Sequence, residues 1–406
     1  MTRDYKKNAK RFVILTVFAY SVGFGIIMPV LPQLIVELEQ VSLSQAAYLG
    51  GWIAAVYAIC QFLMGPLVGN LSDRFGRRPV FLLSLVGYGI DFLLMGLAPS
   101  VFWLFVGRGI AGGLGAVFGP ANAVMADISS SSERAKSFGL VGAAFGIGFI
   151  VGPAIGGLLG EWGTRAPFFV SAALAFATFC YGWFAFPETM KATDRRPFSL
   201  RRANPLGALK SLRKYKDVFK ISMVYFVWVI CANIYPMTWG YFAPIQYHWD
   251  TRMVGLSLAL VGVSMALVQF FILGRFINRF GERHTAMFGM FFGGSIMLFF
   301  SFNTSSTLSL IACVIMGLQS IVMPSVNAMM SRRIPADEQG ELQGFNASLA
   351  ALAALAAPLL YNNSLSYFTG ANTPLFFPGA PFIIATLLVI VAIAALASSK
   401  PAQASN

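Results

Sequence analysis

Residues 65–79 read Gly65-Pro66-Leu67-Val68-Gly69-Asn70-Leu71-Ser72-Asp73-Arg74-Phe75-Gly76-Arg77-Arg78-Pro79. The stretch is glycine-rich and charged, and a long apolar run lies on either side of it. Lipid tolerates helices but not exposed turns, so such a turn lies at the water boundary between two membrane-spanning helices. Its three arginines indicate that this boundary is the cytoplasmic one.

The composition supports the same conclusion for the whole chain. Of its 406 residues, 57% are hydrophobic and 11% are charged, which predicts an all-α polytopic membrane protein and excludes a set of soluble domains. The net charge of +13 lies in short tracts between apolar runs, so we expect no binding of nucleic acid. The four cysteines are scattered through apolar runs and indicate neither a metal site nor disulfides.

A membrane-spanning helix needs about 20 apolar residues, and by this measure the chain has twelve spans. They are expected at residues 12–34, 46–69, 79–97, 101–125, 138–159, 167–186, 221–244, 253–276, 285–302, 308–330, 342–361 and 376–397. The termini and the loops on their side carry 26 of the 29 Lys and Arg residues, which places both termini in the cytoplasm.

The long connection after the sixth span divides the chain into two six-helix bundles. They comprise residues 1–190 and 221–406, joined by a basic cytoplasmic linker at 191–220. Leucines at helical spacing in the linker fit a short helix on the anionic inner membrane surface, and they fit a solvated linker equally well.

The two halves are related to each other. Residues 274–283 repeat the charged turn 205 positions later, with Asn278 where Asp73 stands. An internal repeat of six spans is typical of secondary transporters, whose substrate site lies between the halves. The chain has no nucleotide-binding loop of the Gly-x-x-x-x-Gly-Lys-Ser/Thr type, so we expect neither ATP drive nor enzymatic activity.

The pattern Gly-x-Leu-x-Asp-Arg-x-Gly-Arg-Arg at residues 69–78 resembles the loop motif between helices 2 and 3 of the major facilitator superfamily. The resemblance implies a twelve-helix transporter in which this loop takes part in a conformational switch. Charges at the inner end of the fourth span could bridge to the loop and latch one conformation, although a fixed surface network is equally consistent with the sequence. The expected switch residues are Asp73, Arg74, Gly76, Arg77, Arg78, Asp127, Glu133 and Arg134.

The fifth span carries the spacing G-x8-G-x3-GP-x2-GG, which resembles the signature of the antiporters in this superfamily. Small residues let helix backbones approach closely, so packing alone would also explain them. The spacing nevertheless favours export. The motif consists of Gly139, Gly148, Gly152, Pro153, Gly156 and Gly157.

From about residue 12 to residue 361 the chain is similar to the tetracycline/proton antiporters. The similarity is carried by motifs such as Arg108-Gly109-Ile110-Ala111-Gly112, His248-Trp249-Asp250 and Gln339-Gly340-Glu341-Leu342-Gln343-Gly344. It implies the exchange of protons for an amphipathic drug, and it links His248 to coupling, although a lone histidine is more often a solvated loop residue. Tyr20 and Gly293 replace two embedded aspartates of that family, which argues against tetracycline itself as the substrate.

One intramembrane acid is retained, as Asp91 in the third span. An acid at this depth is costly and is functional by default. Arg108 lies in the fourth span at about the same depth, roughly 10 Å below the outer surface at 1.5 Å per residue, so the two can form an ion pair. Either the pair is static and fixes packing, or Asp91 binds the coupling proton and Arg108 tunes its affinity for it.

Polar and aromatic residues in the middle of apolar helices are the candidates for substrate binding. Many of them could simply be hydrogen-bonded between helices. The scarcity of buried acids argues against a strongly cationic substrate and favours a neutral, zwitterionic or anionic one. The candidates are Tyr20, Gln61, Asn122, Asn233, Tyr235, Trp239, Gln269, Gln319 and Asn327.

The sequence therefore predicts a proton-coupled antiporter that exports a small amphipathic molecule by alternating access. We expect a monomer in a bacterial cytoplasmic membrane, with lipid around it and with no cofactor, because the proton gradient supplies the energy. The alternatives are a proton-coupled uptake carrier for a metabolite, and a lipid flippase or an uncoupled sensor.

Overall fold

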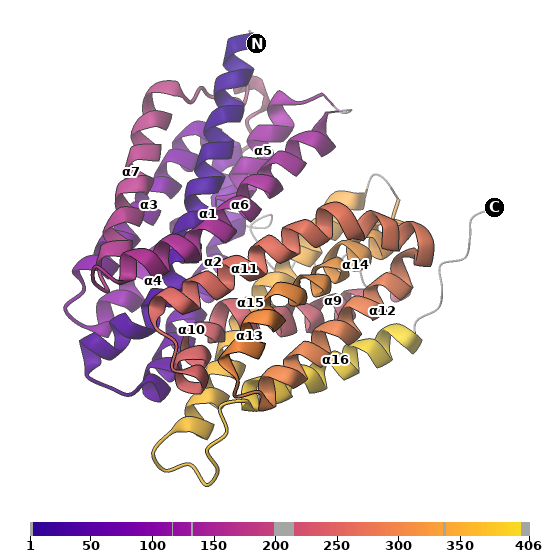
Figure 1. Cartoon of the computed structure of the whole chain (residues 1–406). Coiled ribbons are helices and arrows are strands. Elements are labelled where there is room, and N and C mark those ends of the chain that lie inside the picture. Colours follow the sequence, from indigo (N-terminus) through magenta and orange to yellow (C-terminus); the bar gives the residue numbers. More distant parts are fainter. Residues whose placement is uncertain (1–2, 116, 131–132, 199–214, 336–337, 399–406) are drawn as a thin grey trace. The chain divides into compact units, whose positions relative to one another are not determined.

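The computed structural model describes residues 3–115, 117–130, 133–198, 215–335 and 338–398, and all regular structure in these ranges is helical (Figure 1). Eleven helical runs in this part of the chain are long and apolar enough to cross a membrane. The predicted surface helix of the linker, with its leucines at 206, 209 and 212, lies outside the described residues.

The described residues form two compact units. Unit 1 comprises Met1–Val41, Val56–Pro205 and Thr251–Ala259, and unit 2 comprises Ser42–Ala55, Leu206–Asp250 and Leu260–Asn406. Each unit thus includes the start of one helix whose remainder belongs to the other unit. The division of the sequence into bundles at 1–190 and 221–406 stays a prediction.

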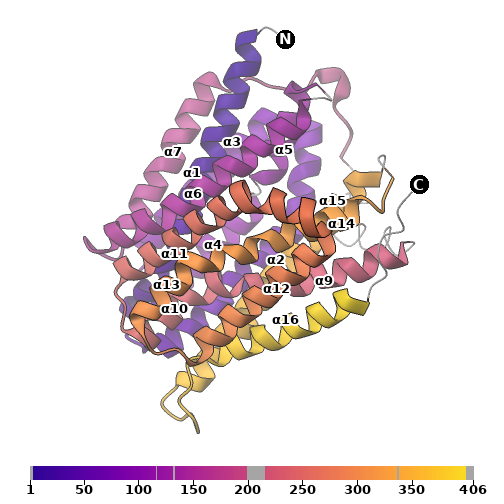
Figure 2. The same cartoon turned by 45° about the vertical axis from the view of Figure 1, so that its right-hand side comes forward.

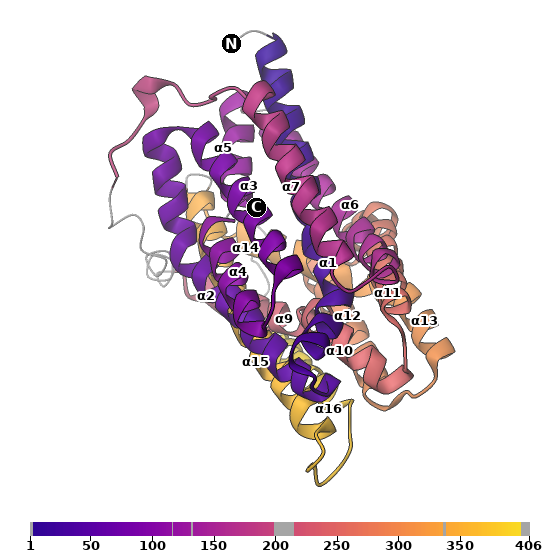
Figure 3. The same ribbon diagram turned by 90° about the vertical axis from the view of Figure 1, so that its left-hand side faces the viewer.

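Unit 1 is built around a long first helix. Its helices are α1 (Arg3–Glu39), α2 (Leu43–Phe75), α3 (Arg77–Leu97), α4 (Val101–Leu114), α5 (Phe118–Ile128), α6 (Arg134–Gly160) and α7 (Ala166–Ala185), followed by the short 3₁₀ helix η1 (Ala192–Asp194). α1 packs along α6 and α7 (Figure 2), and α3 packs between α4 and α7 (Figure 3). The long apolar face of α1 explains its central place, because a helix that is apolar on most sides must be covered on most sides.

The glycine motif of the fifth span explains how closely α6 approaches α1. A Cβ atom on Gly148 would lie 2.7 Å from the Phe18 carbonyl oxygen, and one on Gly152 would lie 2.5 Å from that of Val22. Gly156 meets the α1 backbone in the same way. Among the described residues, no heavy atom lies within 4 Å of the Cβ position of Gly139, so this member of the motif makes no close helix contact with them.

The last motif glycine packs against the start of α11, which belongs to unit 1. A Cβ atom on Gly157 would lie 2.9 Å from the Thr251 carbonyl oxygen. The approach is mutual, because a Cβ atom on Gly255 would lie 2.3 Å from the Pro153 carbonyl oxygen. The motif therefore sets two helix contacts within unit 1, one on each face of α6.

Unit 2 contains more interrupted helices than unit 1. They are α9 (Lys216–Ala232), α10 (Ile234–Tyr247), α11 (Thr251–Leu267), the π-helical η3 (Val268–Ile272), α12 (Leu273–Phe302), α13 (Ser306–Ile315), the 3₁₀ segment η4 (Met316–Ile321), α14 (Val322–Ser331), α15 (Gln339–Thr369) and α16 (Ala380–Ser398). α12 packs against α16 and α14, and α9 packs against α15 and α16. Aromatic rings around Trp239 fill part of its core.

The run Thr251–Phe302 is continuous over 52 residues. At 1.5 Å per residue it would be about 78 Å long, more than twice the thickness of a hydrocarbon core of about 30 Å. Gly281 interrupts it with φ 74°, a left-handed conformation that favours glycine. Gly76, 205 positions earlier, has φ 104° and separates α2 from α3. The two halves therefore have a glycine break at the same position of the repeat. The predicted eighth and ninth spans lie on either side of Gly281.

Candidate functional site

A buried ion pair joins α3 to α4. Arg108 donates from Nε to Asp91 Oδ1 at 3.1 Å, and its Nη2 contacts Asp91 Oδ2. The Asp91 side chain is fully buried and that of Arg108 is 6% exposed. A Cβ atom on Gly107 would lie 2.8 Å from Asp91 Oδ1, so the glycine leaves room for the carboxylate. Two parallel contacts of this kind are the strongest geometry an arginine and a carboxylate adopt.

Aromatic rings enclose the guanidinium group. Its Cζ lies 5.4 Å from the ring centre of Tyr57 and 5.7 Å from that of Phe92. Such cation–π contacts contribute up to about 2 kcal/mol where water is excluded. Arg108 is therefore held by a carboxylate on one side and by rings on the others.

The position of the missing aspartate in the first span is part of the same network. The hydroxyl of Tyr20 shares a hydrogen bond of 2.6 Å with that of Tyr57, which also accepts from Gln61 Nε2 at 3.1 Å. Tyr88 donates its hydroxyl hydrogen to the Tyr20 carbonyl oxygen at 2.8 Å. The structure thus brings four predicted residues together: Asp91, Arg108, Tyr20 and Gln61.

Tyr57 links these residues, and the sequence analysis did not single it out. A signal existed, because Tyr57 precedes Gln61 by four residues and so lies on the same face of α2. The chemical capacity of the site follows from its composition. It offers one buried carboxylate, one guanidinium and neutral hydroxyl and amide groups, so a proton that binds the carboxylate must displace the arginine.

A second charge cluster lies at the loop motif. Arg77 Nη1 contacts Asp73 Oδ1 at 2.7 Å and donates to Ser72 Oγ at 3.1 Å, and its Nε contacts Asp127 Oδ2 at 3.3 Å. One arginine therefore joins the end of α2, the start of α3 and the end of α5. The other motif cations lie outside this bridge. Arg78 donates to the Trp183 carbonyl oxygen at 2.5 Å, and Arg74 lies 5.1 Å from the ring centre of Phe75.

Glu188 caps the start of α3 from the connection that follows α7. Its two carboxylate oxygens accept from the backbone N–H groups of Arg77 at 2.9 Å and Arg78 at 3.1 Å. A Cβ atom on Gly76 would lie 2.3 Å from Glu188 Oε2, so the glycine gives the acid access as well as a positive φ. The next residue, Thr189, donates to Asp127 Oδ2 at 3.2 Å. The sequence analysis missed both residues, although Glu188 is an acid in a strongly basic connection.

Replacing Glu188 with alanine should destabilise the protein by about 0.5–2 kcal/mol, because it exposes two unpaired N–H groups at a helix start. The thermal unfolding midpoint of the purified protein measures this. Glu161→Ala is the matched control, since its carboxylate belongs to an exposed pair with Arg252 at 3.5 Å and contributes little. If the unfolding midpoint falls equally in the two variants, the Glu188 cap contributes no more to stability than an exposed ion pair does.

Unit 2 repeats the loop ion pair with the charges exchanged. Glu282 contacts Arg332 at 2.9 Å, and these residues lie 205 positions after Arg77 and Asp127. Arg283 donates to the carbonyl oxygens at 396 and 397, at the end of α16. The second half therefore keeps an ion pair at this level, although Asn278 replaces the first acid of the motif.

Helix breaks also recur at equivalent levels of the two units. In unit 1 the break lies between Leu114, where α4 ends, and Phe118, where α5 begins. The corresponding break in unit 2, about 205 positions later, is the 3₁₀ segment η4. Interrupted helices at corresponding positions of two repeats are the best sequence pointer to a transporter's binding site. Gln319 lies in η4, and its buried side-chain oxygen makes no hydrogen bond of normal geometry to a described residue.

Gly293 stands where the related antiporters have an aspartate, and its surroundings leave no room for one. A Cβ atom there would lie 2.8 Å from the Trp228 ring and 3.2 Å from Gln319 Oε1. Tyr235 is also buried in unit 2, and its hydroxyl makes no hydrogen bond of normal geometry to a described residue. This part of unit 2 is therefore polar but uncharged.

The structure gives the other predicted residues separate environments. Trp239 is 2% exposed and packs with its ring centre 4.9 Å from that of Phe300. Asn327 accepts from Asn346 at 3.0 Å, and Asn233 donates to the Val229 carbonyl oxygen at 2.7 Å. Exposed side chains are those of Asn122 in α5, Gln269 in η3, His248 at the end of α10, and Glu133 and Arg134 at the start of α6.

The chain is similar to known proteins over most of its length. The profile of the Major Facilitator Superfamily matches residues 13–358 and 237–405. The tetracycline resistance protein, class C, of Escherichia coli is 36% identical over 96% of this chain and 97% of its own length. Multidrug resistance protein 2 of Bacillus subtilis (strain 168) is 27% identical over 96% and 97%.

Solved structures share the fold. The human organic anion transporter MFSD10 (TETRAN) superposes with a TM-score of 0.73 at 21% identity, over 98% of this chain and 100% of its own. A D-xylose–proton symporter superposes with a TM-score of 0.74 at 17% identity, over 98% of both chains.

Proposed function

Because this chain belongs to the major facilitator superfamily, we propose that it is a proton-coupled antiporter that exports a small amphipathic organic molecule by alternating access. The buried pair of Asp91 and Arg108 is the observation that carries the proposal. Burying both charges of this ion pair costs desolvation energy, because the Asp91 carboxylate has no contact with water. If the pair only held α3 against α4, an uncharged packing contact would do so equally well. The charges acquire a function if a proton competes with Arg108 for the Asp91 carboxylate.

The proposed cycle uses this competition. When Asp91 is deprotonated it holds Arg108, and when it is protonated the guanidinium turns to the surrounding tyrosine rings and hydroxyls. The contacts between α3 and α4 thereby change with the protonation state. The ion pairs at the loop motifs, Arg77 with Asp127 and Glu282 with Arg332, would form in one conformation and break in the other.

We propose twelve spans with both termini in the cytoplasm of a bacterium. The break at Gly281 divides a helical run too long for one crossing, and it does so where Lys and Arg gather. In this span map Arg165 and Arg252 lie on the outer side, and each lies beside an acid, Arg165 with Glu37 at 3.3 Å and Arg252 with Glu161 at 3.5 Å. The orientation of the protein in the membrane therefore follows from the basic tracts on the side of the termini. We further propose that the protein works as a monomer and without a cofactor.

We expect little tetracycline resistance from this protein, although several relatives are named for it. Tetracycline is carried as a metal chelate with a positive charge, which embedded aspartates would favour. Tyr20 is hydrogen-bonded as a neutral group, and Gly293 packs against Trp228, so neither position supplies a charge. The measurement is the inhibitory tetracycline concentration in a sensitive host, with the class C protein expressed at the same level as control. Resistance equal to that control and lost in Asp91→Asn would contradict the expectation.

Inside-out vesicles from an overexpressing host test the function. Norfloxacin, chloramphenicol and fluorescein serve as zwitterionic, neutral and anionic probes, and ethidium serves as the cationic counterpart. Under an imposed pH gradient, acid inside, at least one of the first three should accumulate, and a protonophore should abolish the accumulation. If none accumulates, and right-side-out vesicles instead take up a metabolite such as D-xylose together with protons, the uptake alternative is correct.

A further inference from the structure

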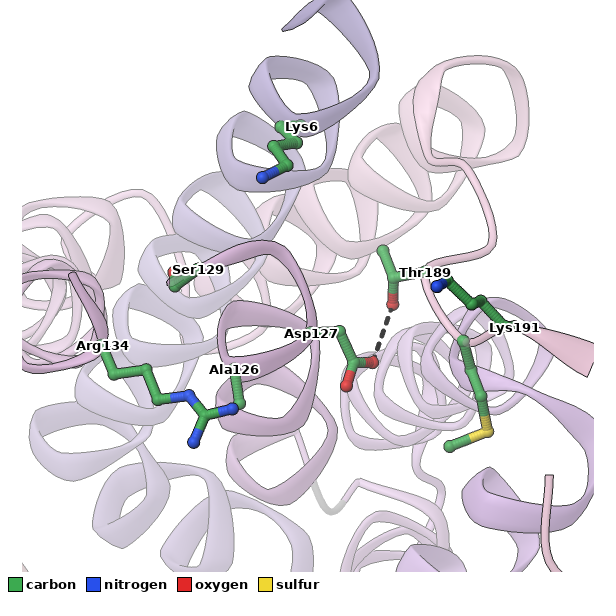
Figure 4. A pocket seen from close by; sticks show the side chains of 8 residues that line it. Lys6, Ala126, Asp127, Ser129, Arg134, Thr189 and Lys191 are labelled. Carbon is green, nitrogen blue, oxygen red and sulfur yellow. Dashed lines mark hydrogen bonds between the residues drawn. The ribbon is translucent and has the colours of Figure 1, made fainter. Parts of the chain in front are cut away.

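A cavity of 520 Å³ lies in unit 1 where three segments meet: the start of α1, the junction of α5 and α6, and the connection that follows α7 (Figure 4). We call it the basic cavity. The cavity is separate from the buried ion pair, and it shares Asp127 with the contacts of the loop motif. Its lining residues are Lys6, Ala126, Asp127, Ser129, Arg134, Thr189, Met190 and Lys191.

Positive charge dominates the lining. Lys6 reaches down from α1, Lys191 lies near Thr189, and Arg134 comes from the first residue of α6 (Figure 4). Asp127 is the one acid among the described lining residues, against three cations. Its Oδ2 atom contacts Arg77 Nε at 3.3 Å and accepts from Thr189 Oγ1 at 3.2 Å. The described lining residues therefore carry an excess of positive charge.

The potential of these cations extends to a nearby carboxyl group. The pKa of exposed Glu133 is lowered, first by the hydrogen bonds it accepts from Ser130 and then by the positive charges of Lys6 and Lys10. The N-terminal lysines thus act on a carboxyl group next to the start of α6. An anion that enters the cavity would meet the same attraction.

We propose that the basic cavity binds a phosphate group, either the phosphodiester of an anionic lipid headgroup or free inorganic phosphate. Phosphate offers acceptor oxygens in several directions, which suits cations that arrive from three segments. The hydroxyl groups of Ser129 and Thr189 are further polar contacts in the lining. Basic pockets at the cytoplasmic level of membrane helices are a common form of headgroup site.

Binding would connect segments that are far apart in the sequence. Lys6, Arg134 and Lys191 come from α1, α6 and the connection after α7, which carries Glu188, the cap of α3. A bound phosphate would therefore restrain the same connection that holds the loop motif. The expected result is a more stable protein whenever phosphate is present, because a ligand of the folded state raises the unfolding temperature.

Titration with inorganic phosphate at constant ionic strength, against chloride, tests the site in the purified full-length protein. The thermal unfolding midpoint, followed by tryptophan fluorescence, should rise with phosphate for the wild type. Lys6→Gln and Lys191→Gln should each weaken the apparent affinity about tenfold, as expected for loss of one charged contact. Lys7→Gln is the matched control, since it removes the same charge from the adjacent position, which does not line the cavity.

A second arm identifies the source of the phosphate group. The midpoint is measured in phosphatidylcholine vesicles with and without phosphatidylglycerol. A rise with phosphatidylglycerol that is lost in the Lys6→Gln/Lys191→Gln double variant and kept in Lys7→Gln supports a lipid headgroup. A response to inorganic phosphate alone, with the same variant pattern, supports free phosphate. No response in either arm, or an equal loss in Lys7→Gln, would overturn the site.

Discussion

Arg108→Ala should abolish proton-driven transport and destabilise the folded protein. Removing one member of a buried ion pair costs about 3–5 kcal/mol, because the other charge is left without compensation. Asp91 is fully buried, so it would respond by binding a proton and keeping it. The variant would then be fixed in one protonation state. The measurement is probe accumulation in inside-out vesicles under a pH gradient, together with the thermal unfolding midpoint.

Two further variants make this result specific. Arg108→Lys keeps the charge but loses the bidentate geometry and the flat contact with the rings, so we expect partial activity. Arg252→Ala removes an arginine from an exposed pair with Glu161 and should change stability by less than about 1 kcal/mol. If Arg108→Ala transports as well as Arg252→Ala does, the buried pair has no part in coupling.

Gly152→Ala should also abolish transport, for a reason of packing. The added Cβ atom would lie 2.5 Å from the Val22 carbonyl oxygen and 2.9 Å from Gly25 Cα, so two helix backbones must separate. Overpacking of this kind costs about 1–3 kcal/mol. The separation would also break the close contact between α1 and α6. We expect transport to require that these two helices stay packed together throughout the cycle.

Gly139→Ala is the matched control within the same motif. No heavy atom of the part of the chain that the structure describes lies within 4 Å of its Cβ position, and alanine favours a helix over glycine by up to about 1 kcal/mol. We therefore expect unchanged transport and an equal or higher unfolding midpoint. Loss of transport in both variants, without loss of stability in Gly139→Ala, would indicate that the motif acts through something other than close packing.

Features that depend on residues near in sequence could be predicted. The break at Gly76 and its repeat at Gly281 follow from local patterns, and so does the pairing of Asp91 with Arg108, since a tight turn joins their helices. The extent of the charged turn is a wrong prediction, because residues 65–75 belong to α2 and α3 already begins at Arg77. Span boundaries were less exact. α1 begins at Arg3 and α2 continues to Phe75, because hydropathy marks the lipid-facing part of a helix while the helix itself extends into water.

Features that depend on distant contacts could not be predicted. Glu188 reaches the start of α3 across more than a hundred positions, and no local pattern shows which N–H groups it meets. The exchanged charges of Glu282 and Arg332 were hidden for another reason. A comparison of the halves by residue identity finds no match at either position, and only the contact shows that the pair is retained.

Substrate-induced proton release is the most direct test of Asp91 as the coupling carboxylate. The detergent-solubilised protein is mixed, in weakly buffered solution, with the probe that the wild type transports, and the pH change is recorded. The wild type should release protons, whereas Asp91→Asn should release none and should still exchange the probe downhill in vesicles. If Asp91→Asn releases protons as the wild type does, the buried pair is structural and the coupling site lies elsewhere.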